Sequence, residues 1–133
     1  MRVVDTNVIA YFFIQSSETI HAEALYLKDP VWVAPFFWHS EFLNVLATYM
    51  GAHRMTPAEA IALASEAELF MAGRGHSVNT SLVLNLAAES NLSAYDCQFV
   101  ALARQLGTRL VTADKQLLKA FPADTIPLNS FKH

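Results

Sequence analysis

Three acidic residues stand alone in apolar surroundings. Asp5, Glu41 and Asp96 are each the only charged residue in a long stretch of the chain, with histidine counted as neutral. A buried carboxylate without a partner costs several kcal/mol, so such residues persist only when they are paired, hydrogen-bonded or bound to a cation. Because the neighbouring sequence offers no basic partner to any of the three, the pattern favours cation chemistry.

The elements that must position these acids read as strands alternating with helices. Short apolar runs at Val3–Val4, Val31–Val33 and Leu110–Val111 are bounded by turn or cap residues. They alternate with longer helical patterns, as buried parallel strands do. The sequence therefore predicts an α/β fold with a mostly parallel central sheet, to which Ile126 adds a short edge strand.

This arrangement brings four carboxylates to one edge of the sheet. Asp5 follows the first strand and Asp114 follows the strand Arg109–Thr112, so both lie at the carboxyl ends of strands, where open α/β folds place their sites. Asp96 lies in the first turn of the preceding helix, and Glu41 lies one turn into the helix after the second strand. We expect a hard oxygen cage, completed by water, that suits Mg²⁺ or Mn²⁺ rather than zinc or copper.

Two helices are predicted to form a hairpin. The first runs from about Phe37 to Met50 and ends at Gly51, and the second begins with the capping box at Thr56 and runs to about Met71. The predicted buried stripe of the first helix comprises Trp38, Phe42, Val45 and Tyr49. Because the hairpin is rich in alanine and aromatic residues, we expect it to contribute to a subunit or partner surface.

Two further helices are predicted beside the acids. One begins at a cap signature, Ser93 to Asp96, and is closed by Gly107. Its predicted buried face comprises Tyr95, Phe99, Leu102 and Leu106. The last helix runs from about Asp114 to Ala120 and stops before Pro122.

Each acid also has an ordinary structural explanation. Asp96 could complete a capping box and Asp114 could cap its helix. Asp5 could be a turn residue after a strand, and Glu41 could reach water from the edge of the core. If instead the four carboxylates converge, repulsion and desolvation should raise their pKa values when no metal is bound. On this interpretation Asp5→Asn removes no helix cap and tests the repulsion directly.

Composition sets further limits. The chain has 133 residues, 53% hydrophobic and only 16% charged, with a net charge of −3. We expect one domain over residues 1–133, and the apolar excess favours a homodimer.

The sequence contains no membrane-spanning run or signal peptide, which predicts a soluble cytoplasmic protein without a membrane partner. Cys97, the only cysteine, excludes an intrachain disulfide and a thiol-rich zinc site and is expected to be a small buried hydrophobe.

The segments around the four acids resemble, in order and spacing, the four acidic motifs of PIN-domain ribonucleases. These segments are Val3–Val8, Ser40–Leu46, Tyr95–Ala103 and Leu110–Asp114. In size the chain looks most like the toxin components of VapBC toxin–antitoxin systems. The resemblance implies a three-layer α/β/α sandwich, an RNA substrate, a small antitoxin partner and metal-dependent cleavage that leaves a 5′-phosphate and a 3′-hydroxyl.

The resemblance also implies roles for individual residues. It makes Asp5, Glu41, Asp96 and Asp114 the acidic quartet and adds Thr112 to the site. We assign Asp5 and Asp96 as principal metal ligands, and Glu41 and Asp114 as ligands through water or as groups that orient the nucleophile. Asn7 and Thr112 would support them by hydrogen bonding. The surface outside the quartet is near neutral, so RNA contacts are expected from Arg54, Arg74, Lys115 and Lys119.

Two other functions are open at this point. Phosphatases of the aspartyl-phosphate kind also begin with a strand that ends in Asp, but they need a second Asp two residues on, where this chain has Asn7. A non-catalytic PIN-like module could serve only to dimerise or to bind an antitoxin, although the complete quartet argues against it. Other motifs are weak, since the histidines lack metal-ligand spacing and Gly73-Arg74-Gly75 reads as a turn.

Overall fold

The computed structural model describes residues 1–133 and contains one five-stranded sheet, in which every strand pair is parallel and the order is β3-β2-β1-β4-β5. The strands are β1 Arg2–Val4, β2 Trp32–Pro35, β3 Gly75–His76, β4 Leu110–Thr112 and β5 Thr125–Pro127. The predicted α/β class and parallel sheet are confirmed, including the edge strand at Ile126.

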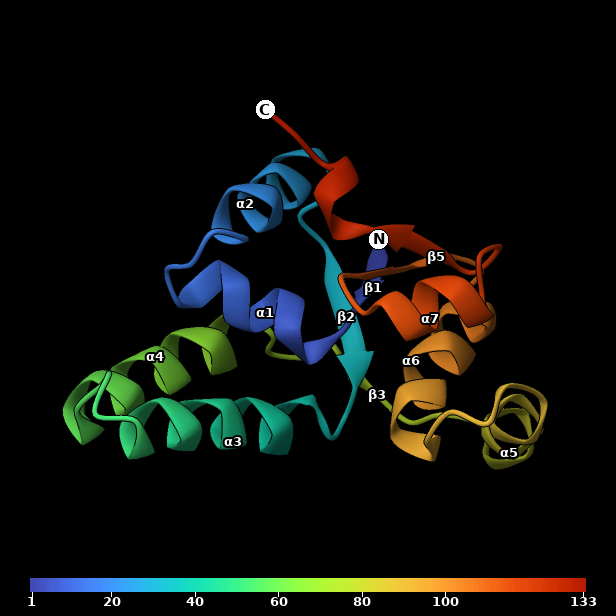
Figure 1. Ribbon diagram of the computed structural model, residues 1–133, viewed down its shortest axis with the longest axis horizontal. Helices are drawn as coiled ribbons and strands as arrows, with labels where there is room; N and C mark the ends of the chain where they lie inside the picture. The colour runs from blue at the N-terminus through green and yellow to red at the C-terminus, as the bar shows by residue number, and fades with distance from the viewer.

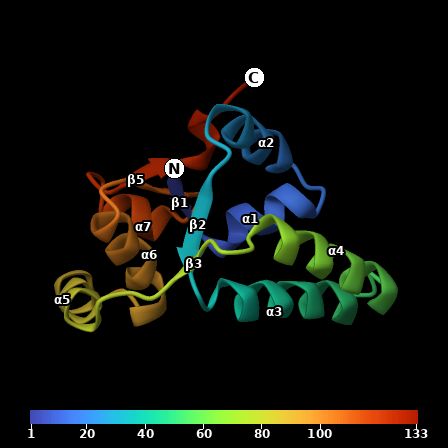
Figure 2. The ribbon, with the colours of Figure 1, turned by 180° about the vertical axis from the view of Figure 1, so that it is seen from behind.

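Helices cover both faces of the sheet (Figure 1). Those of one face are α1 Thr6–Phe13, α2 Thr19–Lys28, α3 Trp38–Gly51 and α4 Pro57–Phe70. Those of the other face are α5 Thr80–Ser90, α6 Ala94–Gln105 and α7 Lys115–Ala120. A short 3₁₀ helix, η1, spans Leu128–Ser130 and packs with the helices of the first face. Figure 2 shows the same separation from behind, with β2 between the two helical layers. The expected α/β/α sandwich is confirmed.

Successive side chains on the central strands point into two different cores, one on each face of the sheet. Val4 and Val111 face the core shared with α1 to α4, whereas Val3 and Leu110 face the core shared with α5 to α7. All four are fully buried. Successive side chains on a strand point to opposite faces, so a strand covered on both faces is apolar throughout. This is why the strands read as continuous apolar runs.

The predicted hairpin is formed by α3 and α4, which pack against each other (Figure 1). Thr56 caps α4 through the predicted capping box with Glu59. The buried stripe of α3 differs in part from the prediction, because Val45 and Tyr49 are only partly buried while Leu46 lies in the core. Helix α3 also includes Gly51 and is capped by Ala52.

Helix α6 begins and ends as predicted, but one of the four residues of its predicted buried face, Tyr95, is exposed. The Ser93 side chain accepts a hydrogen bond from the Asp96 backbone, and Gly107 has the left-handed φ of 65° that follows a helix end. Phe99 is buried in the core, whereas Tyr95 is 63% exposed. Tyr95 lies in the first turn, beyond the part of α6 that packs on the sheet.

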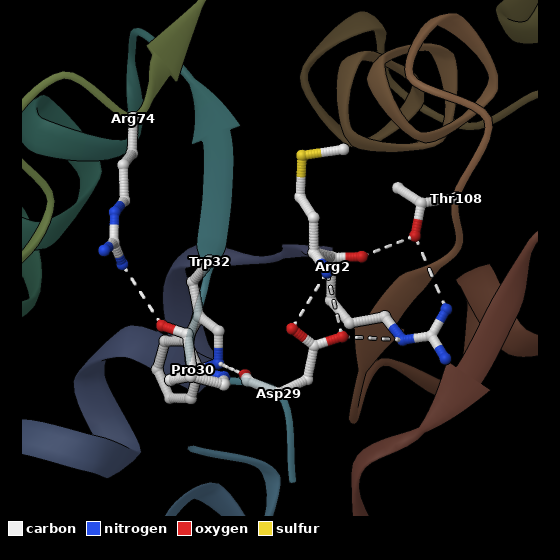
Figure 3. A network of polar contacts seen from close by, with 7 residues as sticks. Arg2, Asp29, Pro30, Trp32, Arg74 and Thr108 are labelled. Carbon is white, nitrogen blue, oxygen red and sulfur yellow. Dashed lines mark hydrogen bonds and ion pairs between the residues drawn. The ribbon is translucent and has the colours of Figure 1, made fainter. Parts of the chain in front are cut away.

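A polar network ties together the amino-terminal edge of the sheet (Figure 3). Arg2 Nε lies 3.7 Å from Asp29 Oδ2, and Trp32 Nε1 donates to the Asp29 carbonyl at 2.9 Å. Arg74 donates to the Pro30 carbonyl at 3.2 Å. The network fixes the entry into β2 relative to β1, and it places Arg74 at the edge of the sheet opposite to the four acids.

No helix in the structure is both long enough and apolar enough to cross a membrane.

Candidate functional site

The four acids predicted from the sequence line one pocket, of about 430 Å³, at the carboxyl edge of the sheet. Each acid stands at the N-terminal end of a different helix: Asp5 caps α1, Glu41 and Asp96 lie in the first turns of α3 and α6, and Asp114 caps α7. The pocket lies where the strand order reverses, since β1 leads to β2 on one side and pairs with β4 on the other. Ligands of open α/β sheets bind at such switch points.

Asp5 is the most buried of the four, with 7% of its surface exposed. Its Oδ1 accepts from the Val8 backbone N–H at 3.0 Å, which makes Asp5 the N-cap of α1. The expectation that Asp5 caps no helix is therefore wrong, because the chain turns directly from β1 into a helix. Its other carboxylate oxygen accepts a hydrogen bond from the buried Thr112 hydroxyl. These two bonds fix the carboxylate at the bottom of the pocket.

Thr112 holds two of the acids, as a supporting residue would. While its hydroxyl donates to Asp5, the same oxygen accepts from the Asp114 backbone N–H at 3.0 Å. The Asp114 side chain in turn accepts from the backbone N–H groups of Gln116 and Leu117 at 2.8 and 3.2 Å. Asp114 thus does cap its helix, and it also faces the pocket. The ordinary explanation, a helix cap, is therefore confirmed for Asp114, and its place in the pocket leaves the site interpretation open.

Glu41 is held by a residue that sequence reasoning missed. The Thr6 hydroxyl donates to Glu41 Oε1 at 2.6 Å. Thr6 is buried and lines the pocket directly after Asp5. A hydroxyl next to a candidate ligand was the available signal, but nothing in the sequence indicated that its partner lies 35 residues away. Asn7, the predicted support, lines the same pocket.

The electrostatics of the pocket follow from burial and from the absence of counter-charges. Burial raises the pKa of Asp5 to about 6, against hydrogen bonds from Thr112 and Val8 that lower it, and the charges of Asp114 and Glu41 raise it further. None of the ion pairs in the structure involves any of the four acids. The pocket therefore concentrates acidic groups that no basic side chain neutralises.

The pKa values of two further acids are raised in the same way. Burial raises the pKa of Glu41, and the nearby charge of Asp96 adds to the effect. Burial also raises the pKa of Asp96, and here the charge of Asp114 contributes. Asp114 and Glu41 act on Asp5 in the same way, so each of the four acids interacts electrostatically with two of the others.

The four carboxylates lie further apart than in the expected cage. No three of the acidic, histidine or cysteine side chains lie close enough together to hold one metal ion as they stand. Thr112, Thr6 and the first turn of α7 each hydrogen-bond to one of the carboxylates. The donor set still suits a hard cation, because Mg²⁺ keeps several waters and often uses only one or two carboxylates. Oxygen ligands alone disfavour zinc and copper.

The rest of the pocket is uncharged. Asn7, Ser40 and Asn44 supply neutral polar groups from α1 and α3, and Tyr95 and Phe99 form an aromatic side on α6. No lysine or arginine lines the pocket. The basic residues expected to hold RNA therefore do not line it, and the guanidinium of Arg54, in the loop between α3 and α4, lies over the Tyr49 ring.

Comparisons with known proteins agree with this geometry. Residues 2–121 match the model of a protein family described as the PIN domain. A stretch of 62 residues is 39% identical to Ribonuclease VapC3 from Pyrobaculum aerophilum, and this match covers 45% of the present chain and 47% of that relative. The matched stretch thus spans about half the length of that protein.

The fold is similar to that in the crystal structure of PAE2754, also from Pyrobaculum aerophilum. The TM-score is 0.76, and the superposition covers 97% of this chain and 91% of that chain at 19% sequence identity. At this identity the likeness concerns the fold alone.

Proposed function

The chain belongs to the PIN domain family, and from this premise we propose that it is a metal-dependent endoribonuclease that hydrolyses RNA phosphodiester bonds at the four-carboxylate pocket. We further propose that it acts as the toxin of a toxin–antitoxin pair, with a small antitoxin protein as its partner. The observation that carries the proposal is the convergence of four carboxylates, from four helix N-termini, without any basic partner. The similarity to a protein named as a ribonuclease supports the choice of RNA.

The residues of the pocket fit this chemistry. Asp5 and Asp96 would hold Mg²⁺ or Mn²⁺, with Glu41 and Asp114 acting through water or orienting the attacking water. When bound, the divalent cation supplies positive charge at the phosphate and makes water a usable nucleophile near neutral pH. Burial raises the pKa values of Asp5, Glu41 and Asp96, so uncompensated charge is unfavourable there, and a cation that neutralised it would be favoured.

Thr6 and Thr112 would be positioning residues. Each hydroxyl donates to one carboxylate, Thr6 to Glu41 and Thr112 to Asp5, and so fixes the orientation of that carboxylate. Residues that orient ligands in this way commonly tune metal affinity and activity.

The proposal is tested by incubating the purified protein with a mixed pool of single-stranded RNA and, separately, with p-nitrophenyl phosphate. We expect RNA cleavage with Mg²⁺ or Mn²⁺, none with a chelator in excess, and no hydrolysis of the phosphate monoester. Hydrolysis of the monoester alone would identify a phosphatase instead. No reaction with either substrate, in the presence of metal, would favour a non-catalytic module.

We also expect the protein to be a homodimer that uses the α3–α4 hairpin. Leu43, Ile61 and Leu69 on this hairpin are 42%, 68% and 81% exposed, and such apolar surface is commonly covered by a partner. Light scattering should give twice the chain mass of 14.7 kDa at micromolar concentration, and Leu69→Glu should shift the protein toward the monomer. A wild-type monomer across this range would contradict the prediction.

A further inference from the structure

Tyr95 is an aromatic residue of the pocket that neither packing nor the proposed metal chemistry explains. It precedes Asp96 on α6, and 63% of its surface is exposed. Its ring is not part of the core, and its hydroxyl makes no hydrogen bond within the protein. An exposed tyrosine beside a cluster of acids has a large apolar surface available to a ligand.

The Tyr95 ring is nevertheless held in place. It packs edge-to-face on Phe37, with ring centroids 5.5 Å apart and an interplanar angle of 75°. Phe37 in turn packs edge-to-face on the buried Phe99 at 5.3 Å. Contacts of this kind stabilise a defined ring orientation. Tyr95 therefore offers a preorganised flat surface that costs little entropy to use.

Because the pocket is lined by acids and by no basic residue, RNA binding there needs contacts that are not ionic. An RNA phosphate that enters the pocket meets four carboxylates, and no lysine or arginine lines the pocket to attract it. A bound cation can compensate at the phosphate itself, but the flanking nucleotides need contacts that are not ionic. Unstacked RNA bases obtain such contacts by stacking on aromatic side chains.

We propose that Tyr95 is a base-stacking residue, on whose ring a nucleobase next to the scissile phosphate lies in the bound RNA. The pocket is also lined by Ser40 and Asn44, one turn apart on α3, which offer a stacked base neutral hydrogen-bonding groups beside the carboxylates. This inference rests on the proposed ribonuclease function. It adds a nucleotide-binding subsite to the cleavage site.

The test compares Tyr95→Leu and Tyr95→Phe with wild type on a short single-stranded RNA in Mg²⁺ or Mn²⁺. Tyr95→Leu should raise KM by about 10-fold or more while kcat changes little, because stacking stabilises bound RNA before and during the reaction. Tyr95→Phe retains the ring and should keep the wild-type KM. Phe36→Leu is the matched control, since Phe36 is an equally exposed aromatic residue, at 66%, outside the pocket.

A second arm changes the RNA instead of the protein. Removing the base on one side of the scissile phosphate, then on the other, should raise KM for wild type at one of the two positions. At that position Tyr95→Leu should have no further effect, because both changes remove the same contact. Fluorescence of 2-aminopurine at the same position should be quenched on binding to Asp5→Asn, and the quench should be lost when Tyr95→Leu is added.

The outcomes distinguish failure of the stacking inference from failure of the proposed ribonuclease function. If wild type cleaves no RNA with metal present, the proposed ribonuclease function fails. If wild type cleaves RNA and Tyr95→Leu matches it in KM, the stacking inference is wrong and the nuclease function stands. An equal loss in Tyr95→Phe would assign the hydroxyl, and not the ring, to the reaction and would also overturn the inference.

Discussion

Asp5→Asn is expected to lower the rate of RNA cleavage by about 100-fold or more, the scale of losing a preorganised electrostatic group from an active site. Asp5 is the most buried of the four acids, and its carboxylate is fixed by Val8 and Thr112. Asparagine keeps an acceptor for the Val8 N–H, so α1 keeps its cap. What is lost is the charge that would hold the cation.

The measurement is the rate of cleavage of one labelled RNA at saturating Mn²⁺, with folding of each variant checked by circular dichroism. Glu66→Gln is the control, because Glu66 is an exposed carboxylate on α4 that makes no ion pair. Asp96→Asn should behave like Asp5→Asn. Undiminished cleavage by either site variant would remove the acidic quartet from the mechanism.

The placement of the acids was predictable because it depends on strand direction. In parallel neighbouring strands the carboxyl ends lie at the same edge, so an acid directly after Val4 and one two residues after Thr112 must lie near each other whatever the details of the packing. The same holds for acids one turn into the helices that begin at that edge. Hydrophobic pattern and capping signals sufficed for these elements, and Thr56 and Ser93 do cap helices as their sequences indicate.

Other features were not predictable because they depend on contacts between distant segments. No helix was predicted at α1, α2 or α5. Helix α1 follows Asp5 without a loop, and α2 has only a weak amphipathic pattern. The bond from Thr6 to Glu41 joins two helices that pack only in the folded chain. Tyr95 has the spacing of a core residue, yet α6 extends beyond the sheet at its first turn and leaves the ring exposed.

The metal-free protein should lose stability as the pH rises from about 4 to about 6. Burial gives Asp5 a pKa of about 6 in the folded chain, against an ordinary value of 3.8. Between these two values the folded protein binds more protons than the unfolded chain, so the free energy of unfolding falls as pH rises. The difference between the two pKa values corresponds to about 3 kcal/mol. The raised pKa values of Glu41 and Asp96 act in the same direction.

Asp5→Asn should remove most of this loss. With a chelator near neutral pH we expect the variant to be more stable than wild type by about 2 kcal/mol, because a buried negative charge is gone and the helix cap is kept. Below about pH 4 the Asp5 carboxyl is protonated in both the folded and the unfolded wild-type chain, so the two proteins should have similar stabilities. Urea unfolding at a series of pH values measures both differences.

Bound metal should reverse the order of stability of wild type and Asp5→Asn. A cation that binds only the folded state stabilises it by RT ln(1 + [M]/Kd), where [M] is the free cation concentration and Kd its dissociation constant. Wild type retains the carboxylate that Asp5→Asn lacks, so its Kd for the cation should be lower. Adding Mn²⁺ should therefore raise the melting temperature of wild type more than that of the variant. If wild type melts higher than Asp5→Asn in chelator and gains nothing from Mn²⁺, the four acids do not share a cation, and their convergence at the edge of the sheet must have another cause.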